Sequence, residues 1–134
     1  QVIDMAEALA TLKSESLDPD MVAKARRPDY ALGGHTASLG LCWMPDGTLP
    51  GYGDGMVIGQ HGSWNREPKS GYQVLFVPFD TSGQPVGMPL PILTGFLDDQ
   101  GQAMGRPVGV VIDQNGGILV ADDVGGVVWR VAPK

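Results

Sequence analysis

The sequence predicts an all-β protein that forms about two blades of a β-propeller behind a short helical segment. Twenty glycines and 11 prolines in 134 residues separate short apolar runs, as expected where tight turns join many strands. The same order of runs and turns also occurs twice along the chain. After Pro28 the strand-like runs are Leu39–Met44, Gly55–Gln60, Tyr72–Phe79, Leu90–Phe96, Val108–Asp113, Ile118–Ala121 and Val127–Val131.

The turns between these runs favour hairpins. Asn-Gly and paired glycines supply the positive φ that tight hairpin turns need. The last three runs are therefore expected to form an antiparallel meander. The separating segments are Pro45–Gly47, Asp80–Gly83, Asn115–Gly117 and Gly125–Gly126.

The repeat is the main argument for blades. The first copy begins at Leu39 and the second at Val108, an offset of roughly 70 residues, which is longer than common propeller repeats. Two blades alone leave edges and an unshared core exposed, so the remaining blades are expected in further sequence or in a partner chain. A free-standing β-sandwich with two helices is the competing architecture.

The start of the chain differs from the rest. Apolar residues at helical spacing predict a helix over 2–13, and an acid-proline-acid start predicts a second helix over 19–26, which must stop before Pro28. A chain that starts within a helix and ends at a strand is expected to be a piece of a longer protein, with a processed mature protein as the alternative. The expected division is a helical insertion over 1–28, a blade over 29–97 and a final, incomplete blade over 98–134.

Charge and composition exclude some classes of protein. The net charge of −6 leaves no basic stripe to neutralise phosphates, which argues against nucleic-acid binding. No apolar run approaches the roughly 20 residues that span a bilayer. Cys42, the single cysteine, excludes a disulfide within the chain.

The densest polar segment is the loop Gln60–Arg66, which follows an apolar strand. In the repeat, Gln60 and His61 take the places of Asp122 and Asp123, so both loops are expected to project from corresponding blade corners onto one face. Loops on a rigid scaffold are where binding residues usually lie.

The sequence also allows purely structural roles for the residues of this loop. Ser63 and Asn65 could cap turns, Trp64 could pack between blades and Arg66 could be a surface residue. The pair His61 and Ser63 suggests a base and a nucleophile, but the sequence has no nucleophile elbow.

A metal site is a further alternative. His35, His61, Asp122 and Asp123 could contribute ligands, but none has a tight ligand spacing, and no metal ligand is assigned. Paired aspartates before a Gly-Gly turn more often accept backbone hydrogen bonds within the turn.

Arg106 is the best candidate for binding an acidic ligand. Pro107 fixes the start of the following strand, so the Arg106 side chain is held in a defined direction. A fixed guanidinium binds carboxylates bidentately. A structural salt bridge to Asp122 or Asp123 is the alternative.

Several segments, in order from Asp18 to Val131, resemble the pyrroloquinoline quinone (PQQ)-dependent glucose/sorbosone dehydrogenase family, and in particular L-sorbosone dehydrogenase-like members. The resemblance covers the C-terminal part of the family's six-bladed propeller. It is carried by Pro28–Gly33, His35–Leu41, His61–Arg66, Gly105–Val110 and Ala121–Val131.

The resemblance implies a periplasmic or secreted oxidoreductase. It would oxidise an aldose or sorbosone-type sugar by hydride transfer to PQQ, with calcium polarising the cofactor and a cytochrome or quinone as electron acceptor. By motif, Arg106 would contact the quinone, Arg66 would meet the cofactor's acidic rim and Thr36 would lie near the cofactor. The family's histidine base and calcium ligands lie in earlier blades, so no catalytic residue is assigned and the isolated chain is expected to be inactive.

Val108 departs from the family pattern. Glucose-oxidising members carry a second arginine at this place, two residues after the first, which weakens an assignment to glucose. A non-catalytic propeller that binds carbohydrate or protein is the alternative. A hydrolytic propeller of the lactonase type would need metal-binding acids that this segment does not show.

Overall fold

The computed structural model describes residues 19–133, and the chain divides into two compact units, Gln1–Gly33 and Gly34–Lys134. The described part of the first unit contains the helix α2, Pro19–Lys24. This helix ends earlier than the expected 19–26, because the amide of Ala25 bonds back only three residues, to the carbonyl of Val22. The helix predicted over 2–13 lies outside the described residues.

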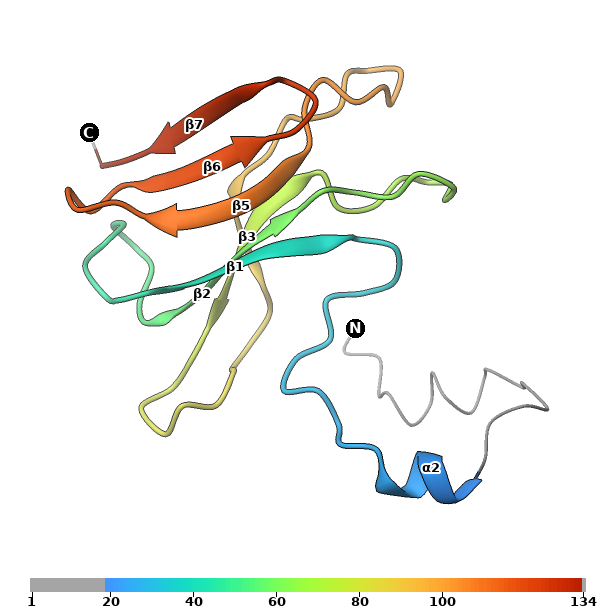
Figure 1. Cartoon of the computed structure of the whole chain (residues 1–134). Coiled ribbons are helices and arrows are strands. Elements are labelled where there is room, and N and C mark those ends of the chain that lie inside the picture. The colour runs from blue at the N-terminus through green and yellow to red at the C-terminus, as the bar shows by residue number, and fades with distance from the viewer. Residues whose placement is uncertain (1–18, 134) are drawn as a thin grey trace. The chain divides into compact units, whose positions relative to one another are not determined.

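The second unit consists of two antiparallel sheets (Figure 1). In both sheets, strands that follow one another in sequence are hydrogen-bonded neighbours, so each sheet is a meander, as predicted. The first sheet contains β1 (Ser38–Met44), β2 (Gly55–Gln60), β3 (Gln73–Pro78) and β4 (Leu90–Leu93); the second contains β5 (Pro107–Ile112), β6 (Ile118–Asp122) and β7 (Val127–Val131).

The predicted strands are all present, but β4 is shorter than expected. It ends at Leu93 rather than at Phe96. Gly95 adopts a φ of 91°, which turns the chain away from the sheet. Phe96 is buried beyond this turn and makes an edge-to-face contact with Trp129 of β7.

The two sheets meet where β1 and β2 lie against β5. This approach requires glycine: a Cβ on Gly40 would lie 2.0 Å from the carbonyl oxygen of Val108, and one on Gly59 would lie 2.4 Å from the same oxygen. The backbones of the two sheets therefore come into direct contact at these strands.

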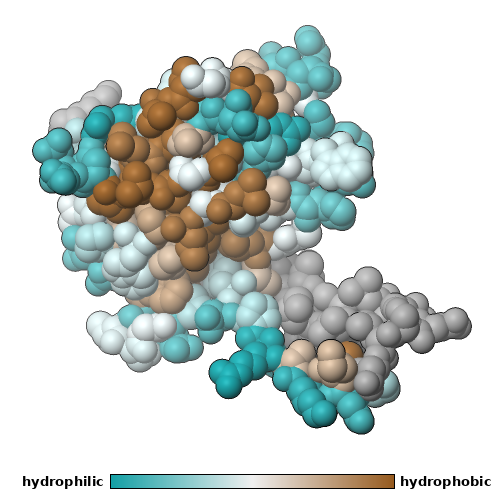
Figure 2. All heavy atoms as spheres, viewed as in Figure 1, coloured by the Kyte–Doolittle hydropathy of each residue, from teal (hydrophilic) through white to brown (hydrophobic). Residues whose placement is uncertain are grey.

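The core lies between the sheets, and apolar residues on their outer faces stay exposed. Leu41 of β1 is 64% exposed, Val111 of β5 is 54% exposed and Val128 of β7 is 65% exposed. Figure 2 shows apolar side chains gathered over the strands of the two sheets. A free-standing sandwich would bury its apolar faces internally, so these exposed faces favour a partial propeller. The buried core residues are Met44, Leu49, Val57, Val74, Phe76, Val110, Ile118 and Val120.

Three turns share one aspartate arrangement. The carboxylates of Asp80, Asp98 and Asp113 each accept hydrogen bonds from the backbone amides two and four residues later, at 2.7–2.9 Å. The residue three positions after each aspartate is a glycine at positive φ. Two of these turns coincide with predicted separators, whereas the turn at Asp98 was missed although it has the same Asp-x-x-Gly pattern.

Candidate functional site

Loops from both sheets meet at one end of the second unit. His61 follows β2 and Asp123 follows β6, and the Nε2 of His61 lies 3.3 Å from Oδ2 of Asp123. This contact confirms that the two loops open on one face. The residues before them, Gln60 and Asp122, end their strands and are 1% and 4% exposed.

Asp122 organises the second of these loops. Its Oδ1 accepts hydrogen bonds from the backbone amides of Arg106, at 2.7 Å, and Gly125, at 2.9 Å, and its Oδ2 accepts one from the Trp129 indole, at 3.0 Å. Burial by itself raises the pKa of Asp122, but hydrogen bonds from Trp129, Gly125, Arg106 and Val124 outweigh it and lower the pKa. The bond to Gly125 confirms the predicted role of an aspartate within its own turn.

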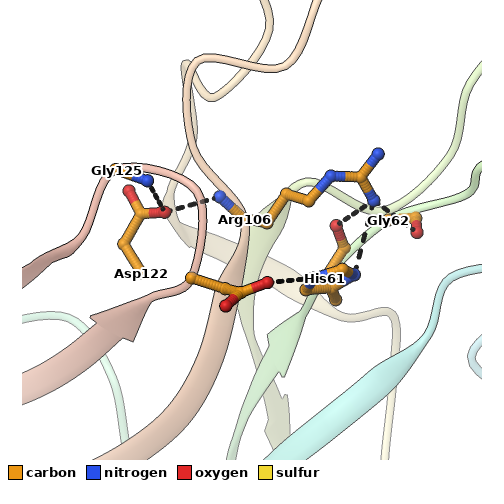
Figure 3. A network of polar contacts seen from close by, with 6 residues as sticks. His61, Gly62, Arg106, Asp122 and Gly125 are labelled. Atoms are coloured by element: carbon orange, nitrogen blue, oxygen red, sulfur yellow. Dashed lines mark hydrogen bonds and ion pairs between the residues drawn. The ribbon is translucent and has the colours of Figure 1, made fainter.

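The Arg106 side chain extends from the start of β5 toward the loop after β2 (Figure 3). Its Nη1 lies 3.3 Å from three acceptors, the carbonyl oxygens of His61 and Gly62 and the Nδ1 of His61. Its guanidinium carbon lies 4.8 Å from the centre of the Tyr72 ring, a cation–π distance. Contacts with residues 19–133 use Nη1, which leaves Nε and Nη2 able to donate to a ligand. We call Arg106, His61, Tyr72 and Asp123 the Arg106 site.

The alternative of a salt bridge from Arg106 to either aspartate is wrong. Asp122 accepts from the backbone amide of Arg106, and Asp123 contacts His61. The guanidinium charge is therefore not neutralised by either carboxylate.

Strained backbone surrounds the site. His35, Ala37 and Tyr72 have φ values of 61°, 48° and 59°, which side-chain-bearing residues rarely adopt. Thr36 lies between the first two, and its carbonyl accepts the amide of Gly62 at 3.0 Å. Strain of this kind often marks a functional site, because the surrounding structure must hold it in place.

The structure brings Thr36 near Arg106 but connects Arg66 elsewhere. Gly62 links Thr36 to Arg106, since its amide bonds to Thr36 and its carbonyl bonds to Arg106. Arg66 is exposed and donates through Nη1 to the carbonyl of Gly34, at 2.8 Å. Among the described residues, Arg66 and Arg106 share no hydrogen-bond partner.

Tyr72 was not singled out from the sequence, because it reads as the first residue of a strand. Its ring lies under the guanidinium, and its hydroxyl donates to the carbonyl of Ser63. A Cβ on Gly62 would lie 2.4 Å from the ring. The glycine next to the histidine in the loop was the available signal that something approaches closely there.

The nucleophile–base interpretation of this loop is not supported. Ser63 is 2% exposed, and its Oγ accepts the amide of Ser70 at 3.1 Å, as the turn-capping alternative predicts. Both ring nitrogens of His61 contact other side chains. Trp64 is 84% exposed in this chain, so packing of Trp64 between these two blades is wrong.

Within residues 19–133, no three His, Cys, Asp or Glu side chains come together in a way that could hold a metal ion. The described helix is neither long nor apolar enough to cross a membrane.

The two meander sheets, joined at their glycine-lined strands, define part of a β-propeller. A family model described as TrAA12-like matches residues 5–134, and the chain belongs to this family. A protein of Borreliella burgdorferi is 33% identical over 103 residues, which cover 76% of this chain and 27% of that protein.

Solved structures agree with this assignment. The holo form of the pyranose dehydrogenase PQQ domain from Coprinopsis cinerea is 30% identical, with a TM-score of 0.66, over 84% of this chain and 30% of that structure. The iodide and calcium structures of Trichoderma reesei Carbohydrate-Active Enzymes Family AA12 are 25% identical, with TM-scores of 0.57, over 72% of this chain and 24% of theirs. The chain thus spans less than a third of each of these relatives.

Proposed function

We propose that this chain forms one wall of the PQQ-binding mouth of a sugar dehydrogenase-like oxidoreductase. Its family, and its likeness to a PQQ domain of a pyranose dehydrogenase, support this class. The whole protein would oxidise a pyranose, an aldose or a sorbosone-type sugar.

The observation that carries the proposal is the guanidinium of Arg106, which is held in place but forms no salt bridge with any carboxylate of residues 19–133. PQQ is a planar, multiply acidic molecule, and Arg106 offers Nε and Nη2 as a fork that matches a carboxylate. The Tyr72 ring and the carbonyls of His61 and Gly62 hold this fork in place before a ligand arrives. The donor set therefore fits an acidic, planar cofactor.

Thr36 and Arg66 would be secondary contacts. The Oγ1 of Thr36 shares a 3.2 Å hydrogen bond with Ser38 and is reachable at the loop before β1. Arg66 is anchored through one nitrogen at Gly34, and the rest of its exposed guanidinium would attract an acidic rim.

When bound, PQQ would supply the quinone that accepts hydride from the sugar. The described residues would bind and orient the cofactor. His61 would not serve as the base, because both of its ring nitrogens are already engaged. The histidine base and the calcium ligands would come from the remaining blades, so the chain alone would not turn over.

The remaining parts of the proposal concern partners and location. The remaining blades would belong to the same protein or to a partner chain, and a cytochrome or quinone would accept the electrons. The protein would act in the periplasm or outside the cell.

Reconstitution of the full-length protein with PQQ and calcium tests this function. Dye reduction with a panel of sugars is expected, and Arg106→Ala should weaken PQQ binding about 10- to 100-fold, because charge-assisted hydrogen bonds are lost. Asp99→Ala, an exposed acid outside the site, is the control. PQQ binding without turnover would leave a non-catalytic carbohydrate-binding propeller, and an absence of PQQ binding would remove the enzyme assignment.

A further inference from the structure

We propose that His61 and Asp123 are positioning residues that hold the Arg106 guanidinium through a neutral imidazole of defined tautomer. This inference rests on the proposed function only where it predicts that His61 and Asp123 affect ligand binding. The arrangement itself is a property of the apo protein.

Three side chains are connected by two successive polar contacts, where the loops of the two sheets meet. Figure 3 shows the contact between His61 and Arg106. Oδ2 of Asp123 lies 3.3 Å from Nε2 of His61, and Nδ1 of the same ring lies 3.3 Å from Nη1 of Arg106. Asp123 comes from the loop after β6, His61 from the loop after β2, and Arg106 from the start of β5. These two contacts thus connect the two sheets.

Hydrogen-bond chemistry assigns the proton on the ring. A guanidinium only donates, so Nδ1 of His61 must present its lone pair to Arg106. The ionised carboxylate of Asp123 only accepts, so Nε2 must carry the hydrogen. The imidazole is therefore neutral, with its hydrogen on Nε2.

The exposures of Asp123 and His61 separate an effect on positioning from an effect on folding. The Asp123 side chain is 67% exposed and that of His61 is 25% exposed. An ion pair or hydrogen bond at such an exposed carboxylate contributes little to global stability. Removing Asp123 should therefore change how the ring is held without unfolding the sheets.

The consequence for ligand binding is preorganisation. Nη1 of Arg106 is shared among two carbonyls and the imidazole, each at 3.3 Å, so no single contact fixes the guanidinium. The imidazole is the only one of the three acceptors that can swing away. Holding the imidazole with Asp123 keeps the guanidinium in one orientation and reduces the ordering cost that a ligand would otherwise meet.

Nitrogen NMR of the full-length apoprotein, labelled with 15N-histidine, tests the arrangement without any cofactor. His61→Gln identifies the His61 signals by their loss. We expect one unprotonated ring nitrogen, whose 15N chemical shift changes in Arg106→Ala. We expect the other ring nitrogen to be protonated, with a 15N chemical shift that changes in Asp123→Ala. Asp99→Ala should move neither. The inference would be overturned if Nδ1 of His61 carried the proton. It would also be overturned if the 15N chemical shift of the unprotonated ring nitrogen were the same in Arg106→Ala as in the parent.

A binding measurement tests the consequence. Asp123→Ala should weaken PQQ binding about threefold to tenfold while its thermal midpoint stays within about 2 °C of the parent. Asp123→Asn, which keeps an acceptor oxygen, should recover part of the loss. Equal PQQ affinity in the parent and in Asp123→Ala would sink the positioning role. If the parent itself does not bind PQQ, the proposed function fails, and the nitrogen shifts alone decide the inference.

Discussion

At the scale of single residues, Asp122 is the support on which the Arg106 site depends. The sequence suggested that this carboxylate either paired with the arginine side chain or capped its own turn. It caps the turn and also accepts the backbone amide of Arg106, so it fixes where β5 begins rather than neutralising the guanidinium. The positive charge stays available for a ligand.

Replacing Asp122 should be costly. Asp122→Ala leaves the Arg106 amide, the Gly125 amide and the Trp129 indole without their acceptor, and we expect a loss of about 2–4 kcal/mol in the free energy of unfolding. Urea denaturation of the full-length protein measures it. Asp99→Ala should change stability by less than about 0.5 kcal/mol. A similarly small loss in Asp122→Ala would contradict this role.

The lowered pKa of Asp122 predicts a pH dependence. Because the folded pKa lies below the unfolded value of about 3.9, the unfolded state binds more protons in acid. The stabilisation by this carboxylate is therefore complete above about pH 5 and is lost as the pH falls through the folded pKa. The difference in the free energy of unfolding between the parent and Asp122→Asn should be constant from pH 6 to 8 and should shrink below about pH 4. If this difference became larger in acid, the pKa of Asp122 would be raised rather than lowered by folding.

At the scale of elements, strands and turns followed local rules. Alternating apolar runs and the Asp-x-x-Gly turns specify strand positions because neighbouring residues decide φ and side-chain direction. The sequence-based predictions were wrong or incomplete at two positions where neighbouring residues do not determine the conformation. β4 stops at Leu93 because Gly95 turns the chain, and Tyr72 lies outside β3 in a positive-φ conformation that a large side chain rarely adopts.

The contact between the two sheets predicts a sharp effect of one methyl group. Gly40→Ala places a Cβ 2.0 Å from the Val108 carbonyl oxygen, and neither backbone can move without disturbing its strand. We expect a loss of about 2–3 kcal/mol in the free energy of unfolding, measured by urea denaturation. Gly53→Ala, which meets no atom within 4 Å, is the matched control. Equal stabilities of the two variants would mean that the sheets are not packed at β1 and β5.

At the scale of the whole molecule, the outer faces of the two sheets expose apolar side chains. The chain spans less than a third of the relatives with which it aligns, and apolar residues of β1 and β5 are exposed in it. In a propeller these faces pack against the next blades. We therefore expect the full-length protein to cover them.

Leu41 offers the test. It is 64% exposed here, so Leu41→Asp would be almost neutral if the chain were complete in itself. In the full-length protein we expect Leu41→Asp to cost more than about 2 kcal/mol in the free energy of unfolding, because a neighbouring blade would bury the new charge. Met88→Asp is the control, since Met88 is 57% exposed and lies in the loop between β3 and β4. Equal small losses would contradict a blade that covers β1.

The sequence by itself determined the strands, most of the turns, the meander order and the candidate status of Arg106, because these depend on residues close together in the chain. Only the tertiary structure decided which partners the charged residues have. His61 meets Arg106 across 45 residues of sequence and Asp123 across 62 residues, and these contacts exist because Gly40 and Gly59 let the two sheets approach at one edge. Local sequence patterns describe the elements but carry no information on which distant loops the packing of those elements brings together.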